Sequence, residues 1–158
     1  MSVINVTAGS QAILTLGNSE VLAAPGASNG LVVPLVQDVT VTAAPGTVRY
    51  STLDSASSSA FTTVNENEIS FNMLVDDNTF FGLANTDNSV ANDGLFTTST
   101  GKTEIFFSVA FEGDTSTDNY IKGKGFIGGL APTASIDQAV WISPGTIIVN
   151  GELTKDTV

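Results

Sequence analysis

The sequence contains no cysteine and no histidine. Without cysteine, disulfide frameworks and thiolate metal sites are excluded; without histidine, imidazole metal ligands are excluded as well. Ser–His–Asp and Cys–His catalysis and acid–base chemistry by histidine are excluded for the same reason. The side chains left for chemistry are carboxylates, hydroxyls, a few lysines and the single arginine, Arg49. We therefore expect a protein that is not an enzyme and has no metal ion, cofactor or catalytic residue.

Basic residues are scarce, with 5 Lys and Arg against 16 Asp and Glu, which gives a net charge of −11. Such a charge argues against a surface that neutralises nucleic-acid phosphates, and equally against an anionic membrane surface. No apolar run approaches the roughly 18 residues that span a bilayer. The start, Met1-Ser2-Val3, lacks the basic and apolar regions of a signal peptide. The sequence thus predicts a soluble protein, made in the cytoplasm, with no membrane partner.

The composition is that of a folded chain. With 158 residues, 42% apolar residues and a mean hydropathy of +0.23, the chain can bury a core and is expected to form one domain, residues 1–158.

Apolar residues recur with period two, which is typical of half-buried strands. In residues 68–75 the alternation places Ile69, Phe71, Met73 and Val75 on one face; in residues 104–111 it places Ile105, Phe107, Val109 and Phe111 on one face. Further strands are predicted near residues 3–7, 11–16, 31–36, 37–42, 47–53, 119–130 and 135–149. Turns are predicted at the Pro-Gly pairs 25–26, 45–46 and 144–145.

One segment departs from this alternation. Asp76, Asp77 and Asn78 precede Phe80, Phe81, Leu83 and Ala84, a pattern that predicts a short helix over 77–86. The polar residues 85–101 are expected to form a surface loop. The predicted fold class is all-β, a sandwich or barrel with one short α-helix.

Three apparent motifs are better explained without chemistry. Residues 123–128 match G-x-G-x-x-G but precede another strand-like run rather than a helix, so the glycines indicate a strand bend or a close backbone approach. The oxygen-rich segments 114–118 and 85–89 lack EF-hand spacing and indicate solvated turns. Glu66 and Glu68, two apart on one strand, share an outward face, and a glycosidase pair is not expected there.

A long connection over residues 42–62 carries Arg49, whose guanidinium can pair with a carboxylate of a neighbouring molecule. Long connections in compact domains are usually functional. A small, acidic, strand-rich chain with this feature indicates a protein that associates with further copies through its sheet edges.

The order of several motifs resembles the tail tube proteins of long-tailed bacteriophages. The similar stretches are Val48–Ser55, a strand followed by Thr-Leu-Asp-Ser and a flexible loop; Glu66–Asp77, a core strand before the short helix; Tyr120–Ile127 and Ser135–Ile142; and the ending Ile148–Thr154. The resemblance covers residues 35–155.

This resemblance implies a virion structural protein of the tail, assembled in the host cytoplasm. It implies hexameric rings that stack into a tube, through which DNA passes without specific binding. The loop 42–62 would reach the adjacent ring, with Arg49, Tyr50, Thr52, Leu53 and Asp54 as contacts. Asp38, Glu66, Glu68 and Glu104, on polar faces of predicted strands, are candidates for the channel lining. Other tail proteins, such as the tape measure, the terminator and a sheath, are the implied partners.

Three other roles are compatible with the sequence. A capsid decoration protein is also small, β-rich and without catalytic groups. A carbohydrate-binding module would need exposed Trp or Tyr platforms, and the chain has one Trp and two Tyr. A glycosidase is the alternative from the enzyme class.

Overall fold

A computed structural model describes residues 12–33, 36–54, 56–84, 87–111 and 119–157. Within these ranges the chain forms strands and two helices. In chain order they are β1 (Ile13–Gly17), β2 (Leu31–Val32), β3 (Val36–Tyr50), β4 (Ser59–Leu74), α1 (Asp77–Phe81), α2 (Ser89–Thr100), β5 (Glu104–Ala110), β6 (Asn119–Gly128), β7 (Thr133–Ser135), β8 (Gln138–Val149) and β9 (Thr154–Thr157). The all-β fold class predicted from the sequence is confirmed.

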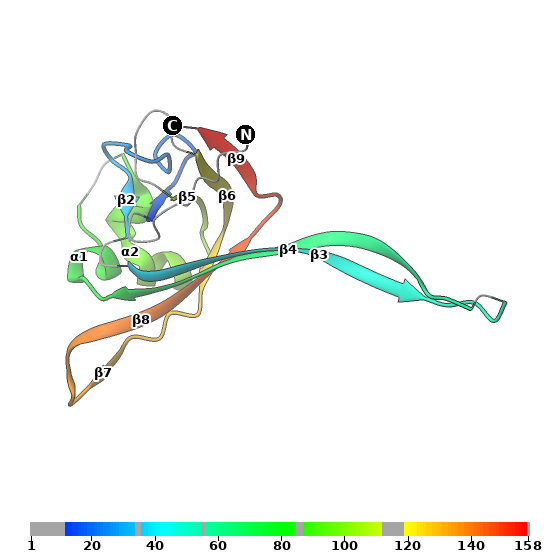
Figure 1. The fold of residues 1–158 in the computed structure, drawn as a ribbon. Helices are drawn as coiled ribbons and strands as arrows, with labels where there is room; N and C mark the ends of the chain where they lie inside the picture. The colour runs from blue at the N-terminus through cyan, green and yellow to red at the C-terminus, as the bar shows by residue number, and fades with distance from the viewer. Residues whose placement is uncertain (1–11, 34–35, 55, 85–86, 112–118, 158) are drawn as a thin grey trace, which may run out of the picture.

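The strands form one antiparallel sheet in the order β2-β1-β5-β6-β8-β4-β3, with β7 paired to β8 and β9 paired to β6. Figure 1 shows a compact body from which β3 and β4 extend together as a long two-stranded arm, while β7 and β8 form a shorter projection on the opposite side. The body and the arm therefore differ in packing. In the body both helices cover the sheet, whereas in the arm β3 and β4 pair only with each other.

The body is held together by the face of the sheet that the alternation predicted. Ile69, Phe71 and Met73 of β4 are fully buried, as are Ile105, Phe107 and Val109 of β5. They pack with Leu14, Leu16, Ile147 and residues of both helices in one cluster. Val75 is partly buried against this cluster, as expected. The alternation predicts Phe111 on the same face, but Phe111 follows the last residue of β5 and is 37% exposed.

Close packing explains a glycine inside β8. Gly145 lies directly opposite Phe71 of β4 in the register, and a Cβ at this position would lie 2.4 Å from Phe71 Cζ. The ring of Phe71 thus occupies the space over Gly145. The turn predicted at Pro144-Gly145 is wrong for this reason: the glycine serves the packing of a continuous strand.

Two predictions about the helices need correction. The predicted helix over 77–86 is shorter, because α1 ends at Phe81 and Gly82 follows with a φ of +107°, which favours glycine. Residues 85–101, predicted to be a loop, contain the second helix, α2. Thus the described ranges contain two short helices, where the sequence predicts one.

Helix α2 forms despite its Ser, Thr and Asn content because a side chain caps its N-terminus and one of its faces packs on the core. The side chain of Asn88 accepts a hydrogen bond from Val90 N at the N-cap. Val90 and Leu95 are buried in the core. Gly94, with a φ of +77°, kinks the helix where it meets α1, and a Cβ there would lie 2.5 Å from Gly82 N. Tertiary packing therefore outweighs the weak helix propensity of the segment.

The remaining expected strands are located as follows. Residues 11–16 correspond to β1, 119–130 to β6, and 135–149 to the β7–β8 pair. The strand expected over 31–36 comprises β2 and the first residue of β3, and that expected over 47–53 ends at Tyr50. The strand expected at 3–7 lies outside the described residues, as do the segment 114–118 and residues 85–86.

Candidate assembly interface

The arm is residues 45–65, where β3 and β4 pair only with each other. Strand β4 gains its second neighbour, β8, from Glu68 onward. Every described residue from Thr47 to Glu66 is exposed. The segment 42–62 predicted as a long connection is thus strand for most of its length, and only residues 51–58 lie between β3 and β4. A two-stranded ribbon is marginally stable alone in water, so this one is suited to contact with another molecule.

An irregularity near the base of the arm decides which face is apolar. The register passes from Pro45↔Asn65 to Thr47↔Thr62, so β4 carries one extra residue there. Such a bulge shifts the following side chains to the other face of the strand. Gly46 lies against the bulge: a Cβ at this position would lie 2.1 Å from Thr63 Oγ1 and 2.9 Å from the Val64 carbonyl. The Pro45-Gly46 pair therefore lies in the edge strand β3, opposite the bulge in β4, and the turn predicted there is wrong.

Beyond the bulge the arm has an apolar face. Val48 pairs with Phe61, and the rings of Phe61 and Tyr50 lie 6.1 Å apart. The opposite face carries Thr47, Arg49, Ala60 and Thr62, since these residues alternate with the first set along the paired strands. Val48, Tyr50 and Phe61 are 43–53% exposed, an arrangement that leaves apolar surface open to water.

The five residues expected as contacts all lie in the distal half of the arm. Arg49 and Tyr50 end β3, and Thr52, Leu53 and Asp54 form the turn beyond it. Leu53 is fully exposed. A hydrogen bond from Thr52 to the Asp54 carboxylate lowers the pKa of Asp54. Arg49 has no ion-pair partner among the described residues. The arm therefore presents one fully exposed leucine in an otherwise polar turn, and a cation without an ion-pair partner among the described residues.

The four acidic residues predicted for a channel lining lie on one face of the sheet, which we call the acidic face. One row of directly opposed residues crosses this face through β3, β4, β8, β6 and β5. In that strand order the row consists of Thr42, Glu68, Ile148, Phe126 and Glu104. The strand alternation places Glu66 and Asp38 on the same face. This face is opposite to the one that packs on the core, and it is open at Asp38, Glu66 and Glu68.

The carboxylates of the acidic face differ in their surroundings. Asp38 accepts hydrogen bonds from Asn72 Nδ2 at 2.9 and 3.1 Å, and Glu68 accepts one from Ser70 Oγ at 3.0 Å. Glu104 is half-buried; Asn150 Nδ2 donates to it, and Lys124 Nζ lies 3.5 Å away. The hydrogen bond from Asn150 and, to a smaller extent, the charge of Lys124 lower the pKa of Glu104. Glu104 thus contributes less free negative charge than the other three.

A second apolar surface was missed by the sequence analysis. We call it the α1 groove, a cavity of about 470 Å³ lined by Val75, Asp77, Phe80, Phe81, Pro132 and Trp141. Phe81 is 61% exposed and Trp141 is 55% exposed. Phe80 points into the core. Because adjacent side chains of a helix point in different directions, Phe81 remains exposed. The adjacent pair Phe80-Phe81 in a five-residue helix is the sequence signal that could have indicated this surface.

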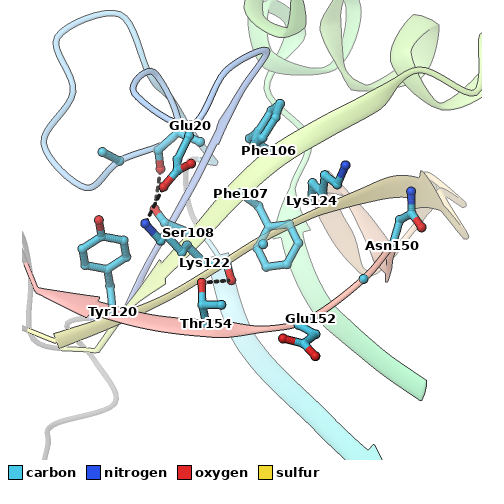
Figure 2. A pocket seen from close by; sticks show the side chains of 14 residues that line it. Glu20, Phe106, Phe107, Ser108, Tyr120, Lys122, Lys124, Asn150, Glu152 and Thr154 are labelled. Carbon is cyan, nitrogen blue, oxygen red and sulfur yellow. Dashed lines mark hydrogen bonds and ion pairs between the residues drawn. The ribbon is translucent and has the colours of Figure 1, made fainter. Parts of the chain in front are cut away.

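A further hollow of about 310 Å³ lies beneath the segment 18–30, between β5, β6 and β9. Figure 2 shows Glu20 directed toward Lys122 in this hollow, with Tyr120 and Thr154 beside them. Lys122 forms ion pairs with Glu20 and with Asp156, the latter at 2.7 Å. Hydrogen bonds to Asp156 and then Glu20 hold the pKa of Lys122 well above its usual range. Its ammonium group is engaged in joining β6, β9 and the segment 18–30.

The discounted motifs occupy structural positions. Gly123, Gly125 and Gly128 lie within β6, and a Cβ at Gly125 would lie 2.2 Å from the Ile148 carbonyl, as expected for a close backbone approach. Asn88 of the segment 85–89 caps α2. Over the described ranges, no three or more Asp or Glu residues gather in a way that could hold a metal ion. No helix in the described part of the chain is long and apolar enough to cross a membrane.

Comparisons with known proteins place the fold. No family model matches the sequence, and no curated protein matches it. Solved structures do match. A chain from the tail of an empty gene transfer agent (GTA) particle, determined with C6 symmetry, has a TM-score of 0.62 and 13% identity, covering 96% of this chain and all of that one. A chain from the virion of a native GTA particle has a TM-score of 0.60 and 11% identity, over 96% and 100% of the two chains.

A third solved structure is the SPP1 tail tube, with a TM-score of 0.65 and 9% identity, covering 97% of this chain and 80% of that one. The three matches span nearly the whole chain. At these identities the likeness establishes the fold, and the fold expected from the resemblance to tail tube proteins is confirmed.

Proposed function

We propose that this chain is a structural subunit of a bacteriophage tail tube. Copies associate into rings, the rings stack, and the resulting channel conducts DNA. The observation that carries the proposal is the arm. It is a two-stranded ribbon with an apolar face that no described part of the same chain covers. The fold shared with chains of a GTA tail and of the SPP1 tail tube supports the same role.

Hexameric rings are the form we propose for the assembly. The support is the sixfold symmetry of the GTA tail whose chain has this fold. Strand β3 is an edge strand of 15 residues, and closing a ring through sheet edges removes the exposed ladder that such a strand otherwise presents. The role is structural rather than enzymatic, and its location is the virion tail, after assembly in the host cytoplasm.

The acidic face is proposed to line the channel. Asp38, Glu66 and Glu68 lie together on the open side of the sheet, and each copy adds a net charge of −11. A negative wall repels DNA phosphates and lets DNA slide. The tape measure, the terminator and a sheath remain the partners proposed at the ends and around the outside of the tube.

A decoration protein is the second candidate, since it would share the β-rich body. The arm distinguishes the two roles, because a subunit attached singly to a shell does not need a ribbon that is open on both faces. Removal of the arm is therefore the informative test.

Residues 48–61 are replaced by Asn-Gly, which joins the paired residues Thr47 and Thr62 through a two-residue hairpin turn. We expect a folded body with a β-type circular dichroism spectrum and an unchanged thermal midpoint, and no rings or tubes in electron micrographs. Tubes formed by the shortened protein as readily as by the full chain would contradict the proposed role of the arm.

A further inference from the structure

We propose that the tip of the arm inserts into the α1 groove of a second copy, with Arg49 paired to Asp77 of that copy. This inference rests on the proposed function and names the contact through which copies associate. It is carried by the chemical match between two surfaces that the fold leaves open and by their positions on the molecule.

The positions exclude docking within one molecule. Figure 1 shows the arm extending to one side of the body, while α1 and the β7–β8 projection lie on the opposite side. When a segment on one side of a molecule fits a groove on the opposite side, copies associate head to tail. Such contacts repeat from copy to copy and either close into a ring or continue as a filament.

The chemistry of the groove matches that of the arm. Of the described residues that line the groove, five are apolar and Asp77 is the one that carries a charge. The distal arm carries the exposed apolar residues Tyr50, Leu53 and Phe61 and the cation Arg49, with Asp54 as the anion in its turn. Neither Asp77 nor Arg49 has an ion-pair partner among the described residues.

If a thin ribbon enters a groove with its tip leading, both of its faces contact the walls of the groove. Its apolar face, with Tyr50 and Phe61, would contact the aromatic residues Phe81 and Trp141. Arg49, on the opposite face, would reach Asp77, and Leu53 would occupy the interior. The groove volume of about 470 Å³ lies within the range of about 300–1,000 Å³ that encloses a ligand with several apolar groups.

Two other hollows in the described part of the chain match the arm less well. The hollow beneath the segment 18–30 is lined by Lys122 and Lys124 as well as by Glu20 and Glu152, and Glu20 is already paired with Lys122, so this lining carries no net charge to attract Arg49. The hollow of about 530 Å³ at the base of the arm is lined by Ala44, Ile148 and Val149 together with Thr, Asn and Glu residues, and among its described lining residues none is aromatic to meet Tyr50 or Phe61.

Because the chain has no cysteine, introduced cysteines report this contact without background. The test variant carries Leu53→Cys and Phe81→Cys in one chain, and the control carries Leu53→Cys and Val21→Cys. All three positions are strongly exposed. Assembled protein is treated with a short bismaleimide and run on a denaturing gel. We expect the test variant to form a ladder of three or more linked chains, and the control and each single variant to form none.

A second variant tests the ion pair. Arg49→Asp should raise the concentration needed for assembly about tenfold or more, since it places two like charges in contact. Arg49→Asp combined with Asp77→Arg should restore assembly to within about threefold of the parent, because the pair is re-formed with reversed signs.

The outcomes separate the two proposals. Rings or tubes in electron micrographs without the Leu53–Phe81 ladder, or with an equal ladder in the Val21 control, would overturn the docking and leave the tail tube role intact. Failure of the double charge reversal to restore assembly would overturn the Arg49–Asp77 pairing. Absence of assembly in the cysteine-free parent would overturn the tail tube role and the docking with it.

Discussion

Val48 and Phe61 lie directly opposite each other on one face of the arm, and the extra residue in β4 is what places them together. Without it, the alternation of β4 would direct Phe61 to the face that carries Arg49. Because of the bulge, the apolar side chains of the distal arm lie on one face and the polar ones on the other. A ribbon inserted into a groove needs such a separation to contact an apolar wall with one face and a charged residue with the other.

The apolar face of the arm is predicted to serve association and not folding. Phe61→Ser should change the free energy of unfolding by no more than about 0.5 kcal/mol, as is usual for exposed positions, but raise the concentration needed for assembly at least about tenfold. Ala60→Ser, on the opposite face at the neighbouring position, is the matched control and should assemble normally. Sedimentation velocity over a concentration series measures both. Equal behaviour of the two variants would show that the apolar face is not used.

The bulge itself is predicted to be necessary. Gly46→Val places side-chain atoms where Thr63 Oγ1 and the Val64 carbonyl lie, so the register of the arm must shift and Phe61 must change face. We expect loss of assembly with an unchanged thermal midpoint of the body. Gly128→Ala, where a Cβ would meet nothing within 4 Å, should have neither effect. Normal tubes from Gly46→Val would refute this view of the bulge.

The packing of Phe71 over Gly145 predicts a coupled pair of core substitutions. Gly145→Ala should destabilise the protein by about 1–3 kcal/mol, the usual range for overpacking. Adding Phe71→Leu should recover part of this loss, because the smaller side chain vacates the space that the new methyl group needs. Urea unfolding of the two single variants and the double variant gives the coupling energy. Additive effects in this cycle would contradict the packing described.

The ion pairs of Lys122 predict a pH dependence. The hydrogen bond from Lys122 depresses the pKa of Asp156, so this contribution to stability is full above the unfolded-state pKa of about 3.9 and is lost as the pH falls through the folded-state value. The raised pKa of Lys122 makes its contribution full below its unfolded-state pKa of about 10.4, and the contribution is lost at higher pH.

Asp156→Asn should therefore lower the urea midpoint at pH 7 and have little effect near pH 2. Asp137→Asn, at the exposed turn between β7 and β8, is the control and should have little effect on the midpoint at pH 7. A difference between Asp156→Asn and the parent that is the same at both pH values would contradict the assignment.

The sequence was most informative where burial imposes a simple period. The alternation in β4 and β5 identified the core face, and the cap before Thr79, whose backbone N–H donates to Asp76 Oδ2 at 3.0 Å, identified the start of α1. The same alternation placed Glu66 and Glu68 on the outward face, although their place in a channel lining stays a prediction.

The sequence was least informative where distant residues decide the local structure. Helix α2 depends on Val90 and Leu95 packing into the core, and its polar composition gives a contrary local signal. The pair Pro144-Gly145 is typical of a turn in sequence, yet the ring of Phe71 requires that glycine within a strand. The sequence predicts strand in the arm only over 47–53 and assigns the rest to a long connection, since a ribbon that packs on nothing in its own chain leaves no burial pattern.

Electron microscopy of the concentrated, purified protein tests the central claim most directly. The account predicts hollow tubes of stacked rings, with Asp38, Glu66 and Glu68 facing the lumen in a helical reconstruction. A protein that remains monomeric and monodisperse at every concentration reached, with the arm free in solution, would contradict it.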